Sequence, residues 1–231
     1  MKRLRFSTTI HNISTWNVRG MNIGKLEIIK QEMQRLHIDL LGSSELHWTG
    51  NGYFKSDEYT SAKAVYSFNI ASDRITSIRI TGSPRSITVL QAYAPTADAP
   101  EKDIEDIYTK LQETIDQIPA RDIIFVMGDF NAKVGSGEDL PAVGKFGLGE
   151  QNDAVDRLIQ CCTENRLSIM NTWFEQPKRR LHTLTAPNGI HRNQIDYILC
   201  HRCLESSILA TKTYPGANCG SGLPVNMHLI R

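Results

Sequence analysis

Apolar positions along the chain follow two patterns, short continuous runs and longer segments with helical spacing. Six runs of apolar and β-branched residues predict strands, at 13–18, 38–41, 87–93, 123–127, 167–171 and 194–199. Apolar residues three and four positions apart predict three helices, at 25–36, 100–118 and 152–165. The run at 123–127 is apolar at every position, which is typical of a strand covered on both faces. We therefore expect an α/β protein with stacked layers, in which residues 1–231 form one domain.

Polar side chains lie at the ends of these strands, and Asp196 interrupts the last of them. The candidates are Asn17, Glu45, Tyr93, Asp129, Asn131 and Asp196. A single such residue is usually a cap or a turn, because a carboxylate in an apolar strand is costly without a partner. Several strand ends that carry oxygen donors favour a site for Mg²⁺ or Mn²⁺, which could neutralise a phosphate and orient a water for attack.

Composition limits the surroundings in which this site would operate. With 40% hydrophobic and 22% charged residues, and no apolar run long enough for a membrane span, we expect a soluble protein that does not insert in a membrane. The basic start has no apolar segment after it, so we expect a nuclear or cytoplasmic protein that is not secreted, and a monomer. Five cysteines in that setting are expected to be reduced. Cys200 to Cys203 resembles half a zinc site, but no second half follows at suitable spacing, so incidental cysteines are favoured.

Basic residues are clustered locally although the net charge is only +1. The triplet Lys178-Arg179-Arg180 is by itself typical of a solvated loop. If the site is that of a nuclease, the triplet and Arg192 become candidate substrate-binding residues that contact phosphates.

Five motifs in order along the chain resemble one known family. They are Trp16-Asn17-Val18-Arg19-Gly20, Ser44-Glu45-Leu46-His47-Trp48, Gln91-Ala92-Tyr93-Ala94-Pro95, Gly128-Asp129-Phe130-Asn131-Ala132 and Gln194-Ile195-Asp196-Tyr197. The chain resembles the endonuclease domain of RTE-type retrotransposons without long terminal repeats, within the endonuclease/exonuclease/phosphatase superfamily. The resemblance covers nearly the whole chain and implies a four-layer αββα sandwich, a divalent metal ion and DNA as the partner.

The resemblance also implies a role for each candidate residue. Glu45 would ligate the ion, and Asn17 would hold a phosphate oxygen or the water of the metal. Asp129 would orient or deprotonate the attacking water. Tyr93 would donate its phenol proton. The remaining two roles are phosphate binding by Asn131 and support of a histidine by Asp196.

That histidine is absent from the chain. The family ends in Ser-Asp-His and an apolar strand, but Gly222 stands here for the aspartate and Leu223 for the histidine. Residues 224–228 do not resemble the closing strand, and His228 comes five positions too late to act as the histidine. We expect weakened metal binding and little catalysis. We also expect Asp196 to lack a partner, unless Arg192, His201 or His228 provides one.

Two further departures from the family lie earlier in the chain. Between Phe54 and Asp73 the family carries roughly two dozen more residues, whereas ordinary loop variation is a few residues. The extra residues include a strand pair that 55–72 is expected to lack, which would expose sheet edges. Arg19 stands where many nucleases of the superfamily place an acidic ligand, although the retrotransposon branch commonly has arginine there.

Three functions remain open at this point. The chain could be an active Mg²⁺-dependent DNA-nicking endonuclease, a phosphatase for a small or lipid phosphoester, or a catalytically impaired domain with a binding or structural role. The motifs argue against the phosphatase, and the missing aspartate and histidine favour impairment over activity.

Overall fold

The strands of the protein form two sheets that pack face to face. The computed structural model describes residues 10–22, 24–47, 65–137, 141–185 and 192–230. In the described residues the first sheet has the order β11 (Ile208–Tyr214), β12 (Val225–Ile230), β1 (His11–Asn17) and β2 (Leu40–Ser44). The second has the order β3 (Val65–Ile70), β4 (Ile75–Ile80), β5 (Ile87–Tyr93), β6 (Ile123–Asp129), β10 (Asp196–His201) and β7 (Leu167–Ile169). A short pair, β8 (Leu184–Thr185) and β9 (Arg192–Asn193), lies beside them.

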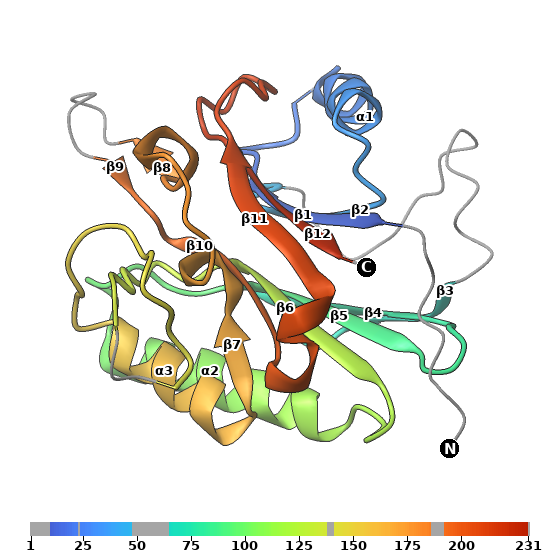
Figure 1. The fold of residues 1–231 in the computed structure, drawn as a ribbon, viewed down its shortest axis with the longest axis vertical. Coiled ribbons are helices and arrows are strands. Elements are labelled where there is room, and N and C mark those ends of the chain that lie inside the picture. The colour runs from blue at the N-terminus through green and yellow to red at the C-terminus, as the bar shows by residue number, and fades with distance from the viewer. Residues whose placement is uncertain (1–9, 23, 48–64, 138–140, 186–191, 231) are drawn as a thin grey trace.

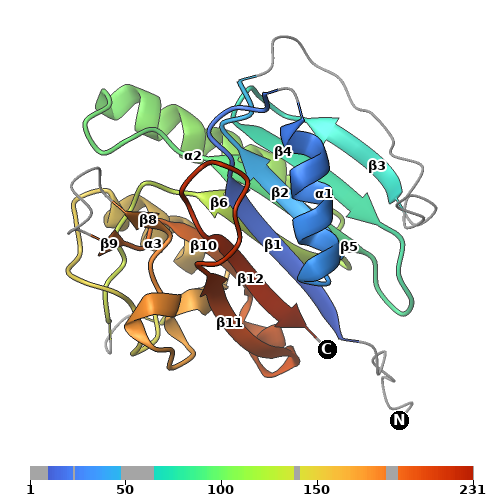
Figure 2. The same ribbon diagram turned by 90° about the horizontal axis from the view of Figure 1, so that it is seen from above.

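Helices cover the outer faces of both sheets. Helix α1 (Lys25–Arg35) lies over the four-stranded sheet, and α2 (Glu101–Asp116) and α3 (Val155–Glu164) lie under the six-stranded sheet (Figure 1). Figure 2 shows α1 from above, along the strands that it covers. The expected four-layer αββα arrangement is therefore present.

Three hydrophobic clusters fill the spaces between these layers. Trp16, Ile29 and Val225 belong to the cluster between α1 and the first sheet. A second cluster, which includes Ile13 and Phe125, fills the space between the sheets. A third packs α2 and α3 against the six-stranded sheet. The fully apolar strand β6 contributes to two of these clusters, as expected for a strand covered on both faces.

The expected elements are present with shifted ends. Strand β2 begins at Leu40 instead of 38, and α3 begins at Val155 instead of 152. The run at 167–171 splits into β7 and a 3₁₀ turn, η2 (Met170–Thr172), and β10 begins at Asp196, so Gln194 lies before it.

The prediction for the C-terminal strand is wrong. Residues 225–230 form β12, which pairs with β1 on one side and β11 on the other. The apolar pattern does not reveal this strand, because Asn226 and His228 occupy buried positions on its inner face. There Asn226 bonds with Asn171, and His228 bonds with Thr211. The altered residues lie in the turn before the strand.

The prediction for the segment after Phe54 needs a partial correction. Residues 65–70 form β3, which pairs with β4 at the edge of the six-stranded sheet, so 55–72 does contain a strand. Residues 48–64 lie outside the described part of the chain. Within that part, β2 is the last strand of the first sheet.

Candidate functional site

Strand register brings the candidate residues together where the two sheets face each other. Tyr93 is the Cα partner of Asp129 across the parallel pair β5–β6, and Asp129 is the partner of Asp196 across β6–β10. In the other sheet, Asn17 ends β1 and Glu45 follows β2 directly. The candidates therefore come from the ends of five strands, one of them β10 at its beginning.

Asn17 connects the two sheets at this point. Its Nδ2 donates to Oε1 of Glu45 at 2.7 Å and to Oδ2 of Asp129 at 3.2 Å. Its Oδ1 accepts the backbone N–H of Arg19 at 3.1 Å, which holds the turn after β1 in place. One amide thus fixes the separation of two carboxylates from different sheets.

Tyr93 lies beside the same carboxylate. Its hydroxyl donates to Oε1 of Glu45 at 3.2 Å. Burial, followed by the charges of Glu45 and Asp129, raises the pKa of Tyr93 to about 12. The phenol therefore stays protonated at neutral pH and remains a hydrogen-bond donor.

Asp129 is buried with a polar shell around it. Oδ1 accepts the backbone N–H of Asn131 at 3.0 Å, and the Asn131 side chain donates to the carbonyl of Ala94 at 2.8 Å. Burial raises the pKa of Asp129 to about 6, against the opposing hydrogen bonds from Asn131 and Asn17. A carboxylate in that range can accept a proton from water near neutral pH.

The backbone is left-handed at two of the candidates. Glu45 has φ 54° and Asn131 has φ 50°, immediately after or near the ends of β2 and β6. Non-glycine residues in this conformation cost on the order of 1 kcal/mol and occur often at functional sites. The turns direct both side chains back over the strand ends.

Asp196 is the candidate with incomplete hydrogen bonding. It is 5% exposed, and among the described residues its Oδ1 has no hydrogen-bond partner. Burial and then the charge of Asp129 raise its pKa well above the usual value, and a hydrogen bond with the Thr183 hydroxyl opposes them. Thr183 also accepts the backbone N–H groups of Ile195 and Asp196. Its partner is therefore Thr183, and none of Arg192, His201 and His228 is among the groups that act on its pKa.

Gly222 and Leu223 lie in the turn before β12. Gly222 has φ 70°, and a Cβ added there would meet no atom within 4 Å. Leu223 is 5% exposed, and its carbonyl accepts the indole N–H of Trp16 at 2.8 Å. The turn is thus anchored to β1, and Leu223 contributes a buried aliphatic side chain.

His228 lies away from this site. It pairs in register with Ile13, four residues before Asn17, which corresponds to roughly 13 Å along the strand. Its Nδ1 is 2.9 Å from the hydroxyl of Thr211, and burial lowers the pKa of His228 to about 3. The expectation that His228 does not replace the histidine agrees with this position.

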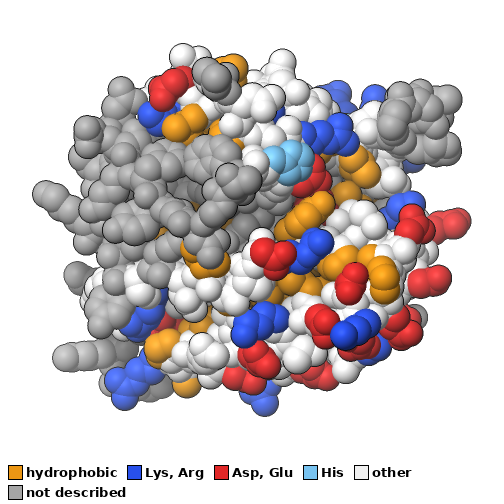
Figure 3. Space-filling view, turned by 180° about the vertical axis from the view of Figure 1, so that it is seen from behind, with side chains coloured by type: hydrophobic (Ala, Val, Ile, Leu, Met, Phe, Trp, Pro, Cys, Tyr) orange, Lys and Arg blue, Asp and Glu red, His pale blue; other side chains and the backbone are white. Residues whose placement is uncertain are grey.

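The basic candidates lie on the surface. Lys178, Arg179 and Arg180 form an exposed 3₁₀ turn, η3, and Arg192 is exposed in β9. On the face shown in Figure 3, Lys and Arg side chains are interspersed with Asp and Glu. The five cysteines are free thiols, as expected.

A metal ion fits these residues only in part. Oxygen donors suit Mg²⁺ or Mn²⁺, and Glu45 uses Oε1 for Asn17 and Tyr93, which leaves Oε2 for an ion. Over the described ranges, however, no group of three or more His, Cys, Asp or Glu side chains is placed to hold a metal. Glu45 is the carboxylate best placed to act as a ligand.

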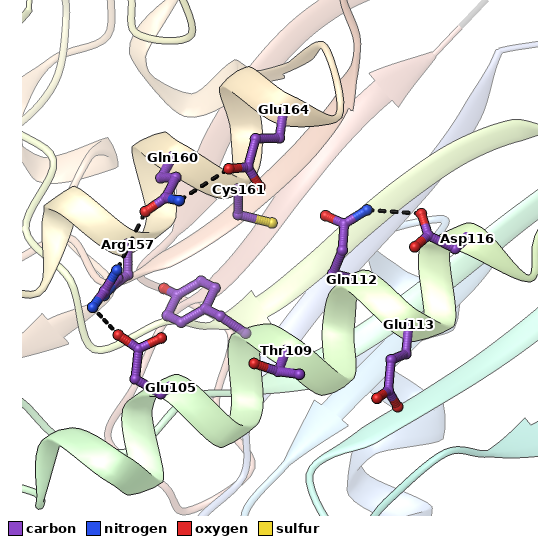
Figure 4. Close-up of a pocket in the computed structure, with 10 residues that line it drawn as sticks. Glu105, Thr109, Gln112, Glu113, Asp116, Arg157, Gln160, Cys161 and Glu164 are labelled. Atoms are coloured by element: carbon purple, nitrogen blue, oxygen red, sulfur yellow. Dashed lines mark hydrogen bonds and ion pairs between the residues drawn. The ribbon is translucent and has the colours of Figure 1, made fainter.

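A groove of about 290 Å³ lies elsewhere, between α2 and α3 (Figure 4). Its walls carry Glu105, Gln112, Arg157 and Glu164, and Arg157 forms an ion pair with Glu105. None of the strand-end candidates lines this groove. The helices that form it cover the outer face of the six-stranded sheet, so it is separate from the carboxylate cluster.

Comparisons with known proteins identify relatives of the chain. Craniofacial development protein 2 from Bos taurus and from Tragulus javanicus are each 45% identical to the chain over 240 residues, which is 95% of the chain. The chain is homologous to craniofacial development protein 2. It spans only 40% and 42% of the length of these two curated relatives. The alignment spans 240 positions, which is more than the 231 residues of the chain. It therefore contains gaps, and the relatives have residues at some positions that have no counterpart in the chain. No family model matches.

Solved structures show the same fold. The endonuclease domain of TRAS1, a telomere-specific non-LTR retrotransposon, aligns with TM-score 0.67 and 13% identity over 96% of this chain and 98% of its own. A 3′ phosphatase, NExo from Neisseria bound to product DNA hairpin, aligns with TM-score 0.67 and 15% identity over 96% and 99%. An AP endonuclease from Archaeoglobus fulgidus gives TM-score 0.66 and 14% identity over 95% and 99%. The chain has the endonuclease/exonuclease/phosphatase fold.

Two contributors to the site were missed in the sequence. Thr183 lies in a loop, and nothing in its surroundings in the sequence marks it as the partner of Asp196. Arg74, whose guanidinium carbon lies 5.2 Å from the centre of the Tyr93 ring, could have been noticed as a charge directly before a strand. The strand β4 had itself not been predicted.

Proposed function

We propose that the chain is a phosphodiesterase-type nuclease domain of retrotransposon origin whose catalysis is strongly impaired. The observation that carries this proposal is the buried carboxylate of Asp196, whose Oδ1 has no hydrogen-bond partner in the described residues. In an intact site of this family that carboxylate would support the histidine, and here Leu223 offers no donor.

The remaining side chains support parts of a hydrolytic site. Asp129, with a pKa of about 6, can take a proton from water, and Tyr93 can donate its phenol proton to a phosphate oxygen. A bound Mg²⁺ or Mn²⁺ beside Glu45 would supply the positive charge that a phosphate transition state needs. Loss of one electrostatic stabiliser typically costs ~10²–10³ in rate, so loss of two groups leaves little activity.

Plasmid nicking in Mg²⁺ and Mn²⁺ tests this proposal. We expect the wild-type chain to give no nicking above a buffer control. The double variant Gly222→Asp/Leu223→His is expected to nick measurably, since Asp tolerates the left-handed conformation at 222 and a Cβ has space there.

Two further variants identify the source of any activity. Glu45→Ala or Asp129→Ala in the restored chain should abolish nicking, which excludes a contaminating nuclease. Wild-type nicking that is lost on Glu45→Ala would contradict impairment. A restored chain that melts like the wild type and still does not nick would show that the missing pair is not the cause.

A further inference from the structure

Two arginines outside the candidate set flank the carboxylate cluster. Arg19 follows β1 and is exposed, and its Nη1 donates to the carbonyl of Ser221 at 3.5 Å. Ser221 directly precedes the two positions where the family's aspartate and histidine are missing. The backbone of Arg19 is fixed by its bond to Asn17, so this positive charge stands beside the site.

Arg74 directly precedes β4, and its side chain lies against Tyr93 of β5. Its guanidinium stacks over the Tyr93 ring at 5.2 Å from the centroid, and its Nη1 donates to the Tyr93 carbonyl at 3.5 Å. The hydroxyl of that ring reaches Glu45, so Arg74 is one side chain away from the candidate metal ligand. Stacking holds the planar guanidinium in one orientation while leaving N–H groups for a ligand.

In the part of the chain that the structure describes, neither arginine is paired with a carboxylate. Among the described residues no ion pair within 4.0 Å involves Arg19 or Arg74, whereas Arg79 pairs with Asp122 and Arg157 with Glu105. Each guanidinium donates to a backbone carbonyl through Nη1, and its remaining N–H groups could bind an anion beside the carboxylate cluster. Guanidinium groups match phosphate oxygens in charge and in geometry.

We propose that Arg19 and Arg74 form a phosphate clamp that binds the phosphodiester backbone of nucleic acid on both sides of the carboxylate cluster without a metal ion. The clamp deepens the proposed function, because it names the residues that hold the substrate of a nuclease-type site.

Binding of a fluorescein-labelled 20-base-pair DNA duplex in EDTA tests the clamp, with fluorescence anisotropy followed over a range of salt concentrations. Arg19→Gln and Arg74→Gln should each weaken binding about threefold to tenfold and reduce the salt slope by about one. Arg19→Lys and Arg74→Lys should keep most of the slope, since they retain the charge.

Arg121→Gln is the matched control. Arg121 is exposed just before β6, roughly 25 Å along that strand from Asp129, and this change should leave binding unaltered. Thermal melts confirm that each variant is folded. Inorganic phosphate should displace the duplex only at far higher phosphate concentration than unlabelled duplex does.

Several results would overturn the clamp. The first is that the wild-type chain does not bind the duplex at low salt, and the second is an unchanged Kd in either folded glutamine variant. The third is that Arg121→Gln weakens binding as much as they do. The fourth is that inorganic phosphate displaces the labelled duplex as readily as unlabelled duplex does. None of these bears on the proposed loss of catalysis, because that is measured by cleavage in the restored variant. Wild-type nicking would in turn contradict the impairment and leave the clamp intact.

Discussion

Among the candidate residues, Asp196 has the least complete hydrogen bonding. Its carboxylate is buried, one oxygen has no partner among the described residues, and Asp129 lies opposite on the adjacent strand. Because its pKa is raised in the folded protein, folding favours the protonated form. The group therefore lowers the stability of the protein as pH rises from the unfolded pKa of ~4 through the higher folded pKa.

We predict that Asp196→Asn is neutral or stabilising by about 1–2 kcal/mol at pH 7, because it keeps the shape and removes an unfavourable charge. The gain should be larger at pH 8 than at pH 5, where the aspartate of the folded protein is closer to full protonation. Thermal melts of both chains at the two pH values measure this.

Asp98→Asn serves as the control for that prediction. Asp98 is exposed in the loop before α2, so its replacement should leave the melting temperature unchanged at both pH values. If Asp196→Asn lowers the melting temperature by several degrees at pH 7, Asp196 has a stabilising partner beyond Thr183.

The candidate residues could be found in the sequence because each stands at the end of a recognisable apolar strand. Asn17 and Asp129 follow runs whose burial is evident from composition alone. Thr183 could not be found, since its contact with Asp196 joins a loop to a strand and leaves no periodic signal. Which side chains meet depends on the order of the strands in each sheet. That order cannot be read from the apolar pattern of the sequence.

At the scale of elements, a chain of buried amides joins β12 to the other sheet. Nδ2 of Asn171 donates to Oδ1 of Asn226 at 3.0 Å, and Nδ2 of Asn226 donates to the carbonyl of Asp196 at 3.1 Å. Oδ1 of Asn171 accepts the backbone N–H of Ile198 at 2.9 Å. These bonds hold the beginning of β10 against β12.

We predict that Asn171→Ala destabilises the protein by about 2–3 kcal/mol, because it leaves the N–H of Ile198 and Oδ1 of Asn226 buried without their partner. Urea unfolding followed by fluorescence gives the free energy of unfolding. Asn69→Ala, at an exposed position of the edge strand β3, should change it by less than about 0.5 kcal/mol. A loss below that value for Asn171→Ala would mean that water replaces the amide.

The strands missed in the sequence share a physical reason. Strand β4 has mostly half-buried positions, and β11 mixes threonine and lysine with apolar residues, so neither forms a continuous apolar run. Strand β12 places polar side chains between the sheets, contrary to the usual pattern. The strands that were predicted include β6, β7 and β10, which are buried at nearly every position.

At the scale of the whole molecule, the stability of the protein responds to pH through buried carboxylates whose pKa values are shifted in opposite directions. Asp122 has a lowered pKa because Arg79 donates hydrogen bonds to it, with support from Thr88, so its contribution to stability is lost as pH falls. The raised pKa values of Asp129 and Asp196 act in the opposite direction. Acid therefore weakens one end of β6 and relieves repulsion at the other.

The affinity of the chain for a divalent metal ion depends on how many carboxylates can share the ion. We predict that calorimetric titration with Mn²⁺ shows at best a millimolar-range site, since Glu45 offers a carboxylate and Gly222 none, and such affinity is at the low end for hard cations. Gly222→Asp should tighten binding, and Glu45→Ala in that background should remove it. A micromolar site in the wild-type chain that is lost on Glu45→Ala would reveal a further ligand.

The central position of β12 has a consequence for how the chain folds during synthesis. Strand β1 is made well before its antiparallel partner, residues 225–230. Until those residues leave the ribosome, β1 can pair only with β2, and β11 has no neighbour in its sheet. Such long-range pairing slows folding and leaves strand edges open to aggregation. Nascent chains halted before Val225 should therefore remain sensitive to protease.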